Sequence, residues 1–186
     1  MNSIVARGDL LRKINFPKYI VILSSMASAL ISLSINLCVV LIFAIFTGVN
    51  FSWRILLVPF NIAFLFTIAF GISLILATLY VKFRDISHIW EIITQILMYS
   101  MPIIYPLSFV MGHQIFGISL ANIILLNPIA MAIQDVRHNL IAVESPTFWT
   151  VYNNHWFAVI PFLITLFIII FGLWYFNNNS KKFAEI

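Results

Sequence analysis

The residues of this sequence that could carry out chemistry are its histidines and any residues in known catalytic or phosphate-binding motifs. The four histidines, His88, His113, His138 and His155, fall in separate stretches of the chain. We interpret them as loop or interfacial residues and expect no metal site. The sequence contains no GxxxxGK phosphate loop, no HExxH, no GxSxG and no pair of cysteines. We therefore predict no catalytic residues, no metal and no bound cofactor.

A short charged turn, Lys82-Phe83-Arg84-Asp85-Ile86, separates two long apolar runs. Arg84 and Asp85 can pair with each other or with a partner protein. Asp85 also stands where it can cap the helix that follows, because a carboxylate there accepts from the free N–H groups of the first turn. The alternative is that the turn only caps a helix and orients the chain.

Two prolines interrupt the next apolar run, in the segment Tyr99-Ser100-Met101-Pro102-Ile103-Ile104-Tyr105-Pro106. Proline removes a backbone donor and clashes with a preceding carbonyl, so a helix must end or kink here. Within a membrane the freed carbonyls need protein or water as partners. The break therefore favours a cavity or a pathway, which Tyr99 and Tyr105 could line; a purely structural kink is the alternative.

The elements that must position these residues are membrane-spanning helices. The chain is 62% hydrophobic and 9% charged, with a mean hydropathy of +1.06, whereas soluble domains carry about 25% charged residues. Four runs, 19–48, 55–81, 89–111 and 156–176, exceed the roughly 17 residues that cross a bilayer as a helix. The third is expected to break near 102–106. The run 112–135 holds Gly117, Asn127 and Pro128, and we expect it to form a re-entrant or interfacial hairpin.

Positive charges orient these spans. Eight of the ten Lys and Arg residues fall on one side of a four-span arrangement, and Arg54 and Arg137 fall on the other. Cytoplasmic loops collect Lys and Arg, so both termini are predicted to be cytoplasmic. This asymmetry explains the net charge of +4 without a nucleic-acid partner. The fold class is therefore an all-α polytopic membrane protein with four spans and an extracytoplasmic hairpin.

The stretch before the first span is amphipathic. Leu10, Leu11 and Ile14 share one helical face, while Arg12 and Lys13 lie elsewhere. Such a helix lies on the membrane surface or docks a cytoplasmic partner. The residues do not choose between these two interpretations.

Five segments together resemble the membrane subunit of ABC-2-type exporters, the permeases for O-antigen, capsular polysaccharide and teichoic acid. The order and spacing of these segments over about residues 8 to 176 carry the resemblance. They are Arg12-Lys13-Ile14-Asn15-Phe16-Pro17-Lys18, Phe83-Arg84-Asp85-Ile86, Pro102-Ile103-Ile104-Tyr105-Pro106, Leu126-Asn127-Pro128-Ile129-Ala130 and Arg137.

The resemblance implies a bacterial plasma-membrane exporter of a lipid-linked glycan. It would consist of two permease copies and two separate ATP-binding subunits. It places the contact with the ATPase at Arg12, Lys13, Arg84 and Asp85. It places the outer gate of the export path at Tyr99, Pro102, Tyr105, Pro106, Asn127 and Pro128. Members of the family usually have six spans, and this chain is expected to lack the first two.

Three other functions stay open at this point. An ABC-2 drug or antibiotic exporter would share the same spans. A membrane accessory subunit that transports nothing would fit a chain with fewer spans than its family. A membrane-embedded glycosyl- or acyltransferase would need a second acid facing Asp85 and Glu91, which the sequence does not offer.

Overall fold

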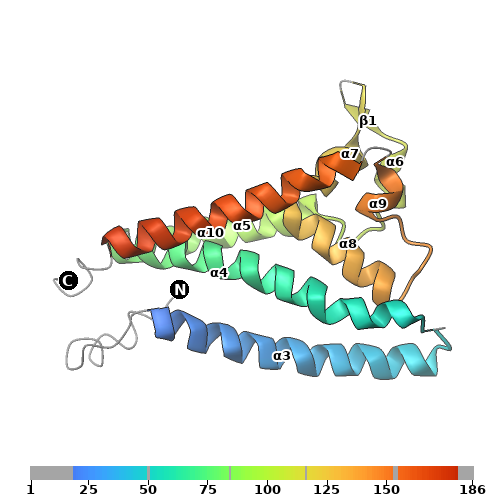
Figure 1. Cartoon of the computed structure of the whole chain (residues 1–186), viewed down its shortest axis with the longest axis horizontal. Coiled ribbons are helices and arrows are strands. Elements are labelled where there is room, and N and C mark those ends of the chain that lie inside the picture. Colours follow the sequence, from blue (N-terminus) through green and yellow to red (C-terminus); the bar gives the residue numbers. More distant parts are fainter. Residues whose placement is uncertain (1–18, 50, 84, 116, 153–154, 180–186) are drawn as a thin grey trace. The chain divides into compact units, whose positions relative to one another are not determined.

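The computed structural model describes residues 19–49, 51–83, 85–115, 117–152 and 155–179. The secondary structure of these residues is helical apart from one short pair of strands (Figure 1). The chain divides into two compact units. The span unit comprises Met1–Val49, Ala69–Trp90 and Ile168–Ile186, and the short-helix unit comprises Asn50–Ile68 and Glu91–Phe167.

Within the part of the chain that the structure describes, three helical segments are long and apolar enough to cross a membrane. The first is α3 (Tyr19–Phe46), and the second runs from Trp53 to Lys82 through η1 (Trp53–Leu57) and α4 (Val58–Lys82). The third, Trp156–Asn179, includes most of η2 (His155–Ala158) and all of α10 (Val159–Asn179). The protein is therefore a multi-pass membrane protein by helix length and composition.

The expected span at 89–111 takes a different form. Its helix α5 (Ile86–Ser100) has 15 residues, which gives a length of about 22 Å. A hydrocarbon core is about 30 Å thick, so α5 by itself is too short to be counted as a span. The four-span count thus remains a prediction beyond the three long helices.

Four serine side chains of α3 are satisfied within the helix itself. In α3 the hydroxyls of Ser25, Ser28, Ser32 and Ser34 each donate to the carbonyl four residues earlier, at 2.8–3.2 Å. Such bonds let a serine sit in an apolar helix without a partner from elsewhere. A helix that is apolar around its whole circumference is suited to a lipid environment.

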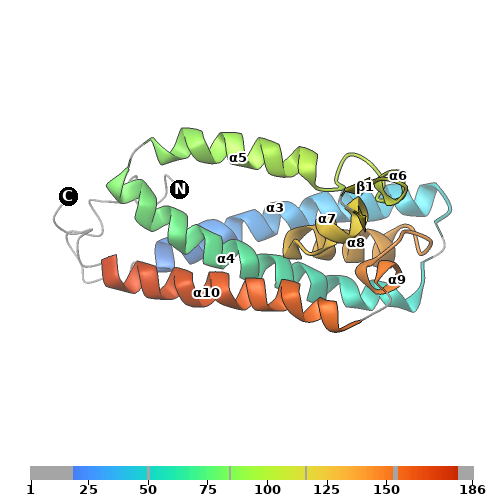
Figure 2. The ribbon, with the colours of Figure 1, turned by 90° about the horizontal axis from the view of Figure 1, so that it is seen from above.

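Glycines bring α4 and α10 into close contact within the span unit. A Cβ on Gly172 would lie 2.7 Å from the carbonyl oxygen of Gly71, and a Cβ on Gly71 would lie 2.9 Å from Cγ2 of Ile168. The two helices run side by side at this point in both views (Figures 1 and 2). Small residues allow such an approach of backbones, which is how helices commonly associate in membranes.

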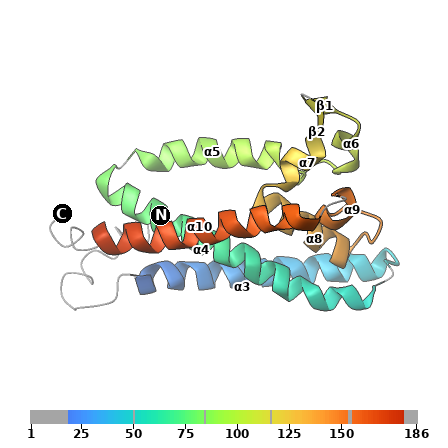
Figure 3. The same ribbon diagram turned by 45° about the horizontal axis from the view of Figure 1, so that its top comes forward.

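The short-helix unit holds the rest of the structure. It contains α6 (Ser108–Met111), β1 (Gln114–Ile115), β2 (Ile118–Ser119), α7 (Leu120–Leu125), α8 (Pro128–Leu140) and α9 (Phe148–Val151). The antiparallel strands pair Gln114 with Ser119 and turn at Gly117, whose φ of 78° favours glycine. Figure 3 shows this strand pair beside α6 and α7.

A small apolar core holds these helices together. It consists of Leu107, Ala121, Leu125, Met131, Phe148 and Ala158. The stretch 112–135 that was expected to form a hairpin is therefore a strand pair followed by α7 and most of α8, which continues to Leu140. Its depth relative to a membrane remains a prediction.

Candidate functional site

The helix break lies directly after α5. The helix ends at Ser100, and turns follow from Met101 to Tyr105. The hydroxyl of Tyr105 donates to the carbonyl oxygen of Ser100 at 3.1 Å. Two further carbonyls of the break accept from Arg137, whose Nη2 lies 2.9 Å from Ile103 O and whose Nη1 lies 3.4 Å from Tyr105 O. A side chain of α8 thus supplies the partners that the broken backbone requires.

The residues that begin α8 place this arginine. The Asn127 side chain accepts from the backbone N–H of Ile129 at 3.0 Å, and Pro128 occupies the first turn. An asparagine cap followed by proline is a strong helix start. Arg137 then donates to Oε1 of Gln134 one turn earlier, at 3.3 Å. Asn127 and Pro128 therefore connect to the break through α8 and Arg137.

The other predicted gate residues differ in exposure. Tyr99 is 67% exposed on α5. Pro102 is buried, whereas Pro106 is exposed. The backbone oxygen of Pro106 accepts from the N–H of Phe109 at 3.1 Å, which starts the turn into α6.

The residues predicted to contact an ATPase are mostly outside the described part of the chain. Arg12, Lys13 and Arg84 fall there. Asp85 is described and exposed, and its backbone carbonyl accepts from the N–H groups of His88 and Ile89 at 3.1 and 3.4 Å. It therefore stands at the start of α5.

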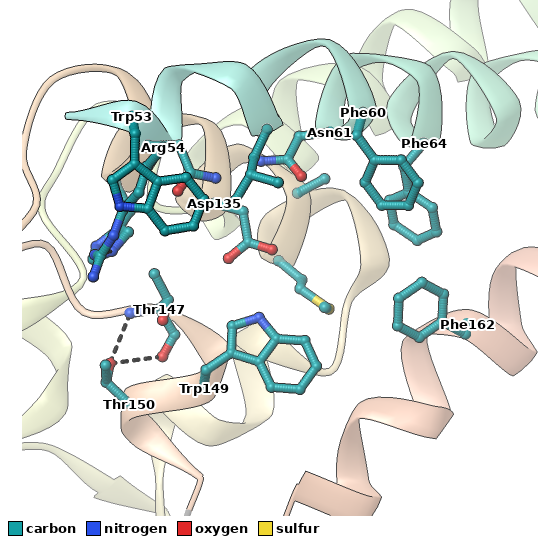
Figure 4. A pocket seen from close by; sticks show the side chains of 15 residues that line it. Trp53, Arg54, Phe60, Asn61, Phe64, Asp135, Thr147, Trp149, Thr150 and Phe162 are labelled. Atoms are coloured by element: carbon teal, nitrogen blue, oxygen red, sulfur yellow. Dashed lines mark hydrogen bonds between the residues drawn. The ribbon is translucent and has the colours of Figure 1, made fainter. Parts of the chain in front are cut away.

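A pocket of about 580 Å³ opens in the short-helix unit (Figure 4). Aromatic rings form much of its wall, and polar side chains of α4, α8 and the α9 region enter it. The lining residues are Trp53, Arg54, Leu57, Phe60, Asn61, Phe64, Met131, Ala132, Asp135, His138, Asn139, Thr147, Trp149, Thr150 and Phe162. Concave sites with apolar walls and a few convergent polar groups are typical ligand sites.

The charged groups of the pocket differ in how they are satisfied. Nη1 of Arg54 donates to Nε2 of His138, and Nδ1 of His138 donates to the carbonyl oxygen of Ser145 at 2.9 Å. With one ring nitrogen donating and the other accepting, His138 is the neutral form. Burial raises the pKa of Asp135 from 3.8 to about 6, because the site desolvates the carboxylate.

Two polar groups of the pocket lack partners among the described residues. Nδ2 of Asn61 is buried without an acceptor. The carboxylate of Asp135 has no hydrogen bond or ion pair within the described part of the chain. The buried donor of Asn61 and the half-buried carboxylate of Asp135 are both available to a polar group of a ligand.

Sequence reasoning did not find this pocket. Arg54 was used only to orient the chain, His138 was assigned to a loop, and Asp135 was given no role. One signal was present, because Asn61 is a polar residue set within an otherwise apolar stretch, whereas Asp135 stands in a polar run with Gln134 and Arg137. Their convergence from α4 and α8 requires the fold. Within the described residues, no three His, Cys, Asp or Glu side chains gather in a way that could hold a metal ion.

Long apolar helices and a compact group of short helices define the chain as an all-α integral membrane protein. A family model for the ABC-2 type transporter matches residues 1–141. Because this match covers most of the chain, the protein belongs to the ABC-2 type transporter family, a family of membrane transporters.

Curated relatives carry one printed name, the O-antigen export system permease protein RfbA. The protein of that name from Myxococcus xanthus is 28% identical over 127 residues, which are 68% of this chain and 47% of the relative. One from Klebsiella pneumoniae is 25% identical over 188 aligned positions, which cover 99% of this chain and 66% of the relative. A second Klebsiella pneumoniae protein is 24% identical over the same shares. The chain thus spans about half to two thirds of the length of these relatives.

Proposed function

We propose that this protein is a membrane permease subunit of an ABC exporter that moves a lipid-linked polysaccharide, such as O-antigen, capsule or teichoic acid, across the bacterial plasma membrane. The observation that carries the proposal is the family match over residues 1–141. The relatives named as O-antigen export permeases support the substrate class. A separate ATPase subunit would supply the energy, and a second copy of the chain would complete the path.

The proposed topology has four spans, a re-entrant hairpin and two cytoplasmic termini. Its support is the distribution of Lys and Arg. Cysteines placed at exposed Lys82 and exposed Glu144, in a Cys38→Ser background, test it with an impermeant thiol reagent in intact cells. We expect labelling at position 144 alone. Labelling at position 82 from outside would show that the chain has the opposite topology.

We propose the outer gate at the break after α5 and the start of α8, with Tyr99, Pro102, Tyr105, Pro106, Asn127 and Pro128 as its residues. The bonds from Arg137 to Ile103 O and Tyr105 O support this, because they connect the break to α8. Arg137 holds the break in one conformation while its bonds last. Movement of α8 would then change the shape of the exit.

We also propose that Arg12, Lys13, Arg84 and Asp85 contact the ATPase. Reversing the charges of Arg12 and Lys13 should weaken co-purification of the ATPase while the permease stays in the membrane. Unchanged co-purification would leave these residues with only an orienting role.

Deletion of the gene in its host, with complementation by the intact gene, tests the function. We expect surface glycan to fall and lipid-linked glycan to accumulate inside, measured by lectin or antibody binding on intact and lysed cells. Normal surface glycan together with increased sensitivity to an antibiotic would replace the proposal with drug export. Normal surface glycan with unchanged sensitivity would contradict both exporters and favour an accessory role.

The double substitution Pro102→Ala and Pro106→Ala tests the gate. It returns two backbone donors and favours a continuous helix. We expect normal membrane levels with poor export and internal glycan accumulation. Normal export by this variant would reduce the prolines to a packing role.

A further inference from the structure

The pocket lies at the ends of two candidate spans. Trp53 and Arg54 begin the segment Trp53–Lys82, and Phe162 follows soon after the start of Trp156–Asn179. The ends of spans meet the headgroup region of a bilayer, where tryptophan is enriched. Trp53 is 76% exposed, so its indole is available to that region. This placement holds for either leaflet and for either orientation of the chain.

One wall of the pocket leads from this end toward the interior of the span. Phe60 and Phe64 follow Trp53 along η1 and α4, and the ring of Phe64 lies 5.2 Å from that of Phe162. The 11 steps from Trp53 to Phe64, the first of them in a 3-10 helix, correspond to a length of about 16–19 Å along the segment. Figure 4 shows Phe60 and Phe64 facing Phe162 across the pocket. An aromatic wall of this length is suited to contact with a lipid acyl chain.

The opposite part of the pocket suits a cation. In Figure 4 the carboxylate of Asp135 is seen between the indole rings of Trp53 and Trp149. Burial of a carboxylate without a counter-charge is costly, and a bound cation would offset that cost. Indole faces attract ammonium groups as well. A carboxylate in a pocket that also contains two indoles therefore favours an amine.

A second subsite suits a phosphate. Arg54 lines the pocket and uses one donor on the neutral His138, which leaves further guanidinium N–H groups for a ligand. Arginine binds phosphate through two parallel hydrogen bonds. Nδ2 of Asn61, which has no acceptor among the described residues, offers one more donor to a phosphate or ester oxygen.

From these groups we propose that the pocket binds the headgroup of a zwitterionic aminophospholipid of the surrounding membrane. Its ammonium would lie at Asp135 between the two indoles, its phosphate at Arg54, and one acyl chain along Phe60, Phe64 and Phe162. A water-soluble sugar would use the indoles and the carboxylate but would leave the aromatic wall uncovered and would offer no phosphate to the remaining donors of Arg54. The proposal is independent of the exported substrate.

The test uses the whole chain in detergent and measures bound lipid by native mass spectrometry. The probes are dilauroyl phosphatidylethanolamine and dilauroyl phosphatidylglycerol, which share acyl chains and phosphate and differ in the ammonium group. We expect the first lipid to bind at least five-fold more tightly. Equal binding of the two lipids would overturn the proposal.

Substitutions test which residues bind the ammonium group and which bind the phosphate. Asp135→Asn should abolish the preference between the two lipids, whereas Arg54→Gln should weaken both. Glu144→Gln is the matched control, because Glu144 is an exposed carboxylate of the same unit outside the pocket, and it should change nothing. Should Asp135→Asn fail to fold, Trp53→Leu provides a second measurement, since loss of an exposed indole should lower phosphatidylethanolamine binding several-fold.

A competition experiment distinguishes a lipid headgroup from the same group on a soluble compound. Free phosphoethanolamine should compete at least ten-fold more weakly than the lipid, because it cannot use the aromatic wall. Competition as strong as the lipid's would overturn the lipid assignment and favour a soluble ligand. An unchanged preference in Asp135→Asn and in Trp53→Leu would overturn the ammonium subsite.

Discussion

The helices α3 and α8 show two ways in which this chain handles polar groups. The 28 residues of α3 are apolar with scattered serines, and most of its side chains are exposed. The hydroxyls of Ser25, Ser28, Ser32 and Ser34 bond to carbonyls of the same helix. The 13 residues of α8 include Gln134, Asp135, Arg137 and His138. Arg137 and His138 bond to residues outside α8, as Arg137 does with Ile103 O and His138 with Arg54.

The difference shows where a site can form in a membrane protein. A helix whose polar groups are satisfied locally requires nothing from the rest of the fold, and it offers nothing to a ligand. Arg137 and His138 of α8 depend on partners that are distant in sequence. The pocket and the capped helix break both occur at this second kind of helix. Four predictions test this difference between helices whose polar groups are satisfied locally and helices whose polar groups need distant partners.

Loss of Arg137 should have the largest effect. Arg137→Met removes the donors to Ile103 O and Tyr105 O. Hydrogen bonds to a charged group contribute about 1.5–3 kcal/mol each, so we expect about 3 kcal/mol of destabilisation in thermal unfolding in detergent. Export should fall as well. Arg137→Lys keeps the charge without the fork of donors and should recover only part of the loss. Unchanged stability in Arg137→Met would remove the contrast between the two helices.

Gly172→Ala tests whether the long helices also contain one contact that depends on the fold. The added Cβ would lie 2.7 Å from the backbone oxygen of Gly71, which cannot rotate away. Overpacking of this kind costs about 1–3 kcal/mol, so we expect about 2 kcal/mol in the same assay. Gly112→Ala is the control, since no atom lies within 4 Å of its Cβ and its φ is −77°. Equal stability of the two variants would contradict the close approach of α4 and α10.

Asp135→Asn should raise stability at high pH. The pKa of Asp135 is raised from 3.8 to about 6 by burial, so the folded state favours the protonated acid. Wild-type stability should then fall as pH rises from about 4 through 6, because ionisation of the buried carboxyl opposes folding. The full shift corresponds to about 3 kcal/mol. Since the pocket is open to water, we expect about 1.5 kcal/mol between variant and wild type at pH 8.

That difference should largely vanish at pH 3.5, below the ordinary pKa of 3.8, because both states then carry mostly the protonated acid. Thermal unfolding in detergent free of aminophospholipid, over pH 3.5 to 8, measures it. A constant difference between Asp135→Asn and wild type at every pH would assign the effect to packing instead.

Ser32→Ala should have the smallest effect. The Ser32 hydroxyl donates to the carbonyl of Ser28 in the same helix at 3.2 Å, and the site is exposed. Surface substitutions without a partner elsewhere usually change stability by less than about 0.5 kcal/mol. A loss above about 1 kcal/mol would show that α3 depends on a contact at this serine, and the comparison with α8 would fail.

The long helices and the family could be predicted from the sequence because their signals are local. An apolar run such as 19–48 specifies a helix in lipid by itself, since the backbone has no other way to satisfy its hydrogen bonds there. The family segments are likewise short and ordered along the chain. The comparisons confirm the ABC-2 family that these segments indicate. The four-span count and the roles of the gate and coupling residues remain predictions.

Only the tertiary structure decided which distant groups meet. Nothing local in Arg137 indicates that it donates to the carbonyls of Ile103 and Tyr105, 32 to 34 residues earlier in the chain. Nothing local in Asp135 indicates that it shares a pocket with Trp53, Asn61 and Trp149. Hydropathy and helix-breaking residues act over one or two turns, so they determine elements. Convergence of side chains depends on how α4, α8 and α9 pack within the short-helix unit, and that packing is a property of the whole unit.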